Sequence, residues 1–193
     1  GPAASPYPFT LGGQAAWSHD DGFPGGYFHT YDALDVGGSA PHKVHVFLPR
    51  DYGPCDEGYP VVYMNDGSTA FWKGGPGNKS WDVAATLGDL WADGALPKII
   101  VVAVEPNDRD YEYSYVKWSD AGACCGATEY ALYLSEHVKP FIDAAYRTDP
   151  SAKSTAIVGS SRGGLASFYV ATRHPDVFGL AGCLSPSFWA GLD

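Results

Sequence analysis

The chain has 193 residues, of which 45% are hydrophobic and 18% are charged, with 24 Gly and 15 Pro. This composition excludes a disordered chain and indicates one folded domain over residues 3–193. A net charge of −10 without any cluster of Lys and Arg makes nucleic acid a poor candidate partner. The longest aliphatic run, residues 99–104, is too short to span a bilayer, so we expect no membrane partner.

The termini and cysteines give weak information about processing and location. Gly1 and Pro2 resemble the remnant of a cleaved expression tag, so they are excluded from the expected domain. The glycosylation pattern at Asn78, the four cysteines and the absence of an initiator Met lean towards secretion without fixing the location. The cysteines lack C-x-x-C spacing, and the sequence indicates no metal and no cofactor.

Short apolar runs predict the strands. A strand is expected around residues 27–31, and residues 42–48 alternate as in a partly exposed antiparallel strand. Residues 61–64, 99–104 and 156–158 are continuous apolar runs, typical of parallel strands buried on both faces. Residues 178–184 predict a last strand.

Three helical patterns alternate with these runs. The first begins with a cap at Ser80 and stops before Gly94, and the second covers residues 128–146 with a kink at Pro140. The third begins near Arg162 and ends before Pro175. Alternating strands and helices predict an α/β fold with a mostly parallel central sheet and helices on both faces.

The segment Gly159-Ser160-Ser161-Arg162-Gly163 fits the G-x-S-x-G pattern between a predicted strand and a predicted helix. In that context a sharp turn exposes Ser161 as a nucleophile at the positive end of the helix. The backbone N–H of Arg162 would supply half of an oxyanion hole. The alternative is an ordinary glycine-rich turn.

Several further motifs carry a family resemblance. They are Val62–Gly67, Arg109-x-x-Glu112-Tyr113, Pro140-Phe141-Ile142, Tyr146-Arg147-Thr148, Gly159–Gly164 and Leu184–Trp189. From about residue 60 onwards the chain resembles the N-terminal part of the putative-esterase branch of the α/β-hydrolases. That branch includes enterochelin esterases, feruloyl esterases, S-formylglutathione hydrolase and the mycolyltransferases. The resemblance implies an α/β-hydrolase fold.

The resemblance also implies roles for individual residues. Ser68 would give the second oxyanion N–H, and Asp66 would lie beside the substrate or brace its loop. Arg109 would bind substrate near the mouth of the site or form a structural ion pair there, with Glu112 in the same motif. Apart from the resemblance, four tryptophans lie on or near loops expected at the carboxyl ends of strands, where they would stack on substrate or belong to the core: Trp72, Trp81, Trp118 and Trp189.

After Ser161 the sequence departs from the order of catalytic residues that is typical of this fold. In this fold an acid and then a histidine follow the serine, but His174 lies at the far end of the same predicted helix, roughly 20 Å away. The catalytic histidine and acid, and the last two strands of the fold, are therefore expected beyond Asp193. The favoured explanation is a C-terminally incomplete hydrolase domain, with a second polypeptide as one possible source of the missing strands. The alternative is a truncated homologue that no longer catalyses.

The predicted function is a serine carboxylic-ester hydrolase that acts through an acyl-enzyme on Ser161. The expected substrate is a small-molecule ester of the sugar, phenolic or siderophore type. Two alternatives stay open. One is an acyltransferase of the mycolyltransferase type, and the other is an inactive homologue that binds a ligand.

Overall fold

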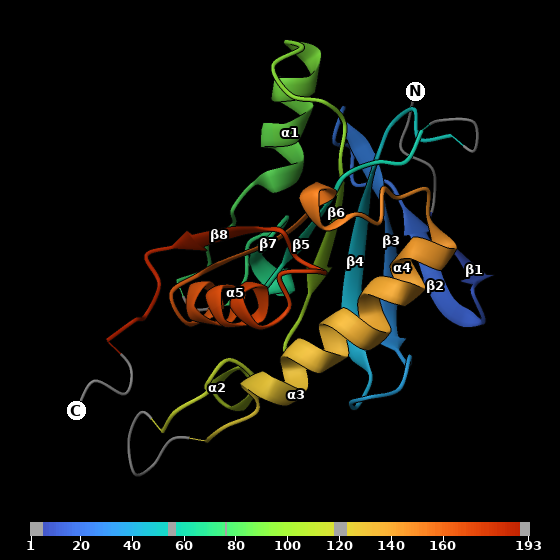
Figure 1. Cartoon of the computed structure of the whole chain (residues 1–193). Coiled ribbons are helices and arrows are strands. Elements are labelled where there is room, and N and C mark those ends of the chain that lie inside the picture. Colours follow the sequence, from blue (N-terminus) through green and yellow to red (C-terminus); the bar gives the residue numbers. More distant parts are fainter. Residues whose placement is uncertain (1–5, 54–56, 76, 118–122, 190–193) are drawn as a thin grey trace.

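The computed structural model describes residues 6–53, 57–75, 77–117 and 123–189, so the expected tag remnant lies outside the described residues. The described strands form one eight-stranded sheet in the order β1-β2-β3-β4-β6-β5-β7-β8 (Figure 1). The strands are β1 Tyr7–Leu11, β2 Gln14–His19, β3 Gly26–Leu34, β4 His42–Pro49, β5 Val61–Met64, β6 Ile100–Val104, β7 Thr155–Ser160 and β8 Leu180–Leu184. The helices are α1 Val83–Ala92, α2 Arg109–Glu112, α3 Ala127–Leu132, α4 Lys139–Ala145 and α5 Arg162–Arg173, with a π-helix η2 Tyr133–Val138 and short 3₁₀ turns η1 Gly67–Thr69 and η3 Ala152–Ser154.

The sheet is mixed, which corrects the expectation of a mostly parallel sheet. Strands β1 to β4 and then β6 pair antiparallel, whereas β6, β5, β7 and β8 pair in parallel. Strands β1 to β4 follow one another along the chain and need only short connections, such as the turn at Gly12 and Gly13, both of which have positive φ. The sequence did not predict strands β1 and β2, because the glycines and exposed aromatic residues of this segment hide the alternation of apolar and polar side chains.

The parallel half agrees closely with the predicted elements. The runs at residues 61–64 and 99–104 form β5 and β6, and the third predicted helix is α5. The second predicted helix is the continuous run α3–η2–α4, whose middle is a π-helix. The first helix begins at Val83 and not at Ser80, because Asp82 has a φ of 50° and therefore cannot belong to the helix.

Helices cover both faces of the sheet, as predicted. On one face Leu134 and Val138 of η2 and Val170 of α5 pack with strand residues such as Val46. On the other face Ala84 and Leu87 of α1 pack against residues of β3 to β6, including Phe47. In Figure 1 the run from α3 to α4 lies in front of β3 and β4. None of the described helices has both the length and the apolar character needed to cross a membrane.

Strand β8 lies at one edge of the described sheet. Leu180 and Leu184 are 52% and 43% exposed, so the apolar side chains of this strand are only partly covered by the described residues. The coverage of this edge by further strands or by a second polypeptide stays a prediction.

Candidate active site

The turn between β7 and α5 carries Ser161. Its backbone angles, φ 56° and ψ −120°, lie in a region that residues other than glycine rarely adopt. A Cβ atom on Gly159 would lie 2.3 Å from the carbonyl oxygen of Gly163, and one on Gly163 would lie 2.8 Å from Asp66 Oδ2. A side chain at Gly159 would clash with backbone, and one at Gly163 would displace the Asp66 carboxylate, so the turn has the sharp strand-to-helix geometry that the G-x-S-x-G pattern predicts.

Three adjacent parallel strands bring the site together. Strands β6, β5 and β7 are neighbours, so their carboxyl ends meet at one edge of the sheet, where open α/β sheets bind ligands. Glu105, Asn65 and Ser161 directly follow these strands. A cleft of about 730 Å³ opens at this edge, and its lining includes Ser161, Ser68, Trp81 and Glu105.

The hydroxyl of Ser161 has a serine as its neighbour. Ser161 Oγ lies 3.2 Å from Ser187 Oγ, and no histidine of the described chain forms a hydrogen bond with it. His174 caps the far end of α5, as the sequence predicted. The other five histidines have hydrogen-bond partners elsewhere. The catalytic histidine and acid, expected beyond Asp193, stay predictions.

The two residues expected to supply the N–H groups of the oxyanion hole belong to η1 and to the start of α5. Ser68 lies in η1, directly after β5, and lines the cleft together with Ser161. Arg162 is the first residue of α5. Gly67 lets this loop lie close to β6, since a Cβ there would be 2.8 Å from the carbonyl carbon of Ala103. The two N–H roles themselves stay predictions.

Asp66 and Arg109 form a bidentate ion pair at the cleft. Arg109 Nε donates to Asp66 Oδ1 at 2.6 Å, and its NH2 group donates to Oδ2 at 2.9 Å. Burial lowers the pKa of Arg109, but the paired carboxylate of Asp66 outweighs it and raises that pKa above its usual value. The Asp66 backbone N–H also donates to Tyr113 Oη at 2.9 Å. The side chains of Arg109 and Tyr113 thus hold the loop that carries Asp66 and Ser68.

Glu112 has a different partner from Arg109. Its Oε1 atom lies 2.9 Å from Nε2 of the buried His42. The two charged residues of the Arg-x-x-Glu motif therefore brace two different segments, the loop after β5 and the start of β4. Sequence spacing alone could not assign these pairs, because the partners are 43 and 70 positions apart.

The three described tryptophans of the prediction divide between the cleft and its surroundings, and Trp118 lies outside the described residues. Trp81, 38% exposed, lines the cleft. Trp72 is not among the described lining residues, and its ring packs 4.8 Å from that of His45. Trp189 is 64% exposed and also lies outside the described lining. A substrate-binding role for Trp72 or Trp189 is untested, but of these three Trp81 alone is placed in the wall of the cleft.

Asn65 is a buried residue of the site that sequence reasoning missed. Its Nδ2 donates to Gly163 O and to Ser167 Oγ, both at 3.0 Å, and its Oδ1 accepts from Tyr130 Oη at 2.7 Å. The side chain thus ties the end of β5 to α5 and α3. Its signal in the sequence was its position, the first polar residue after an apolar strand.

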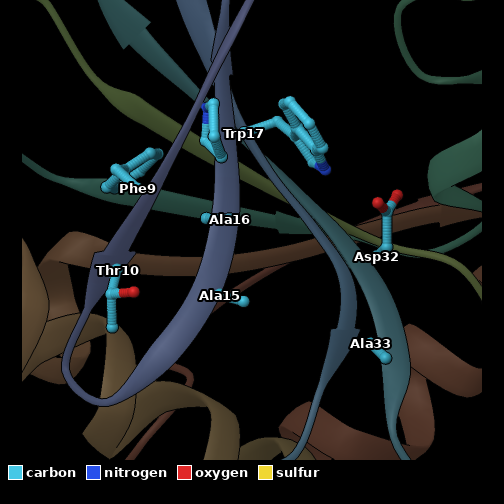
Figure 2. A pocket seen from close by; sticks show the side chains of 8 residues that line it. Phe9, Thr10, Ala15, Ala16, Trp17, Asp32 and Ala33 are labelled. Carbon is cyan, nitrogen blue, oxygen red and sulfur yellow. The ribbon is translucent and has the colours of Figure 1, made fainter.

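A second cavity, about 450 Å³, lies on the hairpin β1–β2 next to β3 (Figure 2). Figure 2 shows Phe9 and Trp17 on the strands of this hairpin and Asp32 on the neighbouring strand. Among the described residues that line it, Asp32 alone is charged, and none is a serine, cysteine or histidine. The cleft at Ser161 is therefore the better candidate for an active site.

Metal ligation finds no support in the described part of the chain. No group of three or more His, Cys, Asp or Glu side chains is arranged there to hold a metal ion.

Comparison with known sequences identifies relatives of most of the chain. The family model described as "Putative esterase" matches residues 39–191. The uncharacterized protein YbbA of Bacillus subtilis (strain 168) is 27% identical over 151 residues, which are 75% of this chain and 56% of that protein. An endo-1,4-beta-xylanase/feruloyl esterase of Xylanibacter ruminicola is 30% identical over 150 residues, which are 73% of this chain and 19% of that protein.

Solved structures share the fold. An IroE-like serine hydrolase from Shewanella oneidensis superposes with a TM-score of 0.70 at 22% identity, over 84% of this chain and 51% of that one. The enterobactin esterase FES from Shigella flexneri superposes with a TM-score of 0.61 at 20% identity, over 84% of this chain and 36% of that one. The chain thus spans about half the length of YbbA and of the IroE-like hydrolase.

Proposed function

Because this chain belongs to the "Putative esterase" family, we propose that it carries the nucleophile of a serine carboxylic-ester hydrolase. The observation that carries the proposal is the strained position of Ser161, between β7 and α5, at the wall of a cleft. Backbone strain of this kind persists where the surrounding structure enforces it, and it clusters at active sites. The glycines on either side of Ser161 enforce it here.

The proposed reaction begins with attack of Ser161 Oγ on the ester carbonyl. A histidine expected beyond Asp193 takes the hydroxyl proton and later gives it to the leaving alcohol. The backbone N–H groups of Ser68 and Arg162 stabilise the tetrahedral oxyanion, where one such donor typically contributes about 2.7–4 kcal/mol. Water then attacks the acyl-enzyme and releases the acid.

The proposed substrate is a sugar, phenolic or siderophore-type ester. The cleft supports this choice because it combines an aromatic wall at Trp81 with charged groups at Lys79, Glu105 and Arg109. Such a lining suits a flat or hydroxylated group better than a long aliphatic chain. The feruloyl esterase activity in the name of the Xylanibacter ruminicola relative supports the phenolic type.

Hydrolysis of p-nitrophenyl acetate tests the proposal. We expect the full-length protein to turn this ester over, and Ser161→Ala to lower kcat by about 10³-fold or more. We expect residues 1–193 alone to hydrolyse it weakly or not at all, because no described histidine lies against Ser161. Acetyl transfer to added trehalose or glucose in place of hydrolysis would indicate an acyltransferase. No turnover by the full-length protein would contradict the enzyme assignment.

A further inference from the structure

A series of hydrogen-bonded side chains leads from Glu105, at the cleft, across β4 and β3 to Asp21, which follows β2. Glu105 Oε1 lies 2.8 Å from His45 Nε2, and His45 Nδ1 lies 2.9 Å from Thr30 Oγ1. Thr30 Oγ1 lies 2.8 Å from His19 Nε2, and His19 Nδ1 lies 2.7 Å from Asp21 Oδ1. We call these five residues the Glu105–Asp21 chain.

The sheet and one tryptophan enclose this chain. Thr30 and His45 are direct cross-strand partners on β3 and β4, and they are 6% and 4% exposed. The ring of Trp72 packs on those of His45 and His19, and its Nε1 donates to Asp21 Oδ2 at 2.7 Å. Trp72 therefore shields the middle of the chain from water.

Hydrogen bonding at all four contacts of this chain requires one more proton than two neutral imidazoles provide. When each histidine donates to its carboxylate, His19 Nε2 and His45 Nδ1 both face the Thr30 hydroxyl. That hydroxyl has a single hydrogen and can donate to only one of them. The other ring nitrogen must then carry a proton and donate to Thr30 Oγ1. All four contacts are satisfied when one imidazolium is shared between two carboxylates.

Glu105 is the end of the chain that reaches the cleft. Its side chain is 28% exposed, and within the described residues its Oε2 atom has no hydrogen bond, since only Oε1 faces His45. The hydrogen bond from His45 lowers the pKa of Glu105 below its usual value, and the charge of Lys43 acts in the same direction against that of Asp32. The cleft wall thus carries an ionised acceptor with a free oxygen.

We propose that Glu105 is a specificity-determining residue that accepts a hydrogen bond from a substrate hydroxyl, held in position by the proton-sharing Glu105–Asp21 chain. This assignment rests on the proposed function. A hydroxyl is the fitting donor because Glu105 and Ser161 line the same cleft, and sugar and phenolic esters both present one. Asp66, the other acidic residue in the described lining, already has both oxygens paired with Arg109.

Matched esters test the specificity. The first pair tests a phenolic hydroxyl by comparing kcat/KM for methyl 4-hydroxycinnamate with kcat/KM for methyl cinnamate. The second pair tests a sugar hydroxyl by the same comparison of 6-O-acetylglucose with ethyl acetate. The wild-type full-length protein should prefer the hydroxylated ester in at least one pair. Glu105→Gln should lower that preference about tenfold and leave the hydroxyl-free ester within about twofold. The exposed Glu136→Gln is the matched control.

The outcomes separate this assignment from the proposed function. Turnover of both members of a pair with a preference that Glu105→Gln does not change would overturn the role of Glu105 alone. So would an absence of preference in both pairs. Failure to hydrolyse any of the four esters would overturn the proposed function, and the role of Glu105 with it.

The proton sharing has a readout that does not depend on turnover. In ¹⁵N NMR spectra, one of the two ring nitrogens that face Thr30, His19 Nε2 or His45 Nδ1, should carry a proton and the other should not. A proton on both nitrogens, or on neither, would overturn this arrangement. Asp20 and His29 are the other titratable groups coupled to His19, so the spectra must resolve His29 as well.

Thr30→Val removes the hydroxyl that bridges the two rings while keeping the shape of the side chain. We expect it to remove the shared proton and to lower the preference for the hydroxylated ester in the same direction as Glu105→Gln. Thr10→Val, at an exposed position of β1, is the matched control. An unchanged preference in Thr30→Val would show that the chain does not position Glu105.

Discussion

Ser161 has an unfavourable backbone conformation and lies in an exposed turn. Holding a residue other than glycine in such a region costs about 1–3 kcal/mol, which the packing of Gly159 and Gly163 imposes on this side chain. The sequence pattern predicted the position of Ser161 correctly because the pattern encodes that local packing.

The strain at Ser161 predicts an unusual order of stabilities. Ser161→Gly should be more stable than Ser161→Ala by about 1 kcal/mol, because relief of strain exceeds the added chain entropy of glycine. Urea unfolding of the two variants, neither of which has the hydroxyl, measures the difference. An equal or lower midpoint for the glycine variant would contradict the strained geometry.

His29 gives the protein a pH-dependent stability. Burial, followed by the nearby charge of His19, lowers the pKa of His29 to about 4, and its Nδ1 lies 3.0 Å from Tyr146 Oη. The unfolded state therefore binds a proton more readily than the folded state between about pH 6.5 and 4. The contribution of His29 to stability is complete above that range and is lost as the pH falls through it.

A variant with a neutral side chain isolates this effect. His29→Gln should flatten the fall in the free energy of unfolding between about pH 6.5 and 4 by about 2–3 kcal/mol. Urea midpoints measured across this range for both proteins test it, whatever the absolute stability of the variant. Parallel pH profiles for the two proteins would contradict the lowered pKa.

Asn65 connects the elements around Ser161. It connects the end of β5 with the carbonyl of Gly163 in α5 and with Tyr130 in α3. A buried polar group that loses its partner costs about 1–3 kcal/mol, so one deletion here leaves several groups unsatisfied.

Replacement of Asn65 should therefore affect both stability and the site. Asn65→Ala is expected to lower the free energy of unfolding by about 2–4 kcal/mol and to slow the labelling of Ser161 by a fluorophosphonate. Tyr130→Phe, which removes only one of these hydrogen bonds, should cost about 1 kcal/mol. An equal loss in the free energy of unfolding for the two variants would contradict the role of Asn65 in connecting these elements.

The elements that the sequence predicted are those with strong local signals. The apolar runs of β5 and β6 and the turn before α5 are each determined within a few residues. The hairpin of β1 and β2 was missed, because its side chains are largely exposed and its pattern is correspondingly weak. The π-helix within the run from α3 to α4 has no distinct periodicity in the sequence.

In the whole molecule, the site depends on contacts between distant segments. The parallel half of the sheet brings Ser161, Ser68 and Glu105 to one cleft, and the antiparallel half supplies His45, Thr30 and His19 behind it. These pairings follow from strand order, which no local pattern encodes. For this reason the strand-to-helix turn at Ser161 could be predicted from the sequence, whereas the partners of Asp66 and Glu105 could not.

The most direct test of Ser161 as the nucleophile is covalent labelling. The full-length protein is incubated with a fluorophosphonate, and the modified residue is identified by mass spectrometry. The expected result is one adduct, on Ser161, that is absent from Ser161→Ala and retained in Ser160→Ala, the neighbouring serine. No adduct, or an adduct that persists in Ser161→Ala, would contradict the assignment.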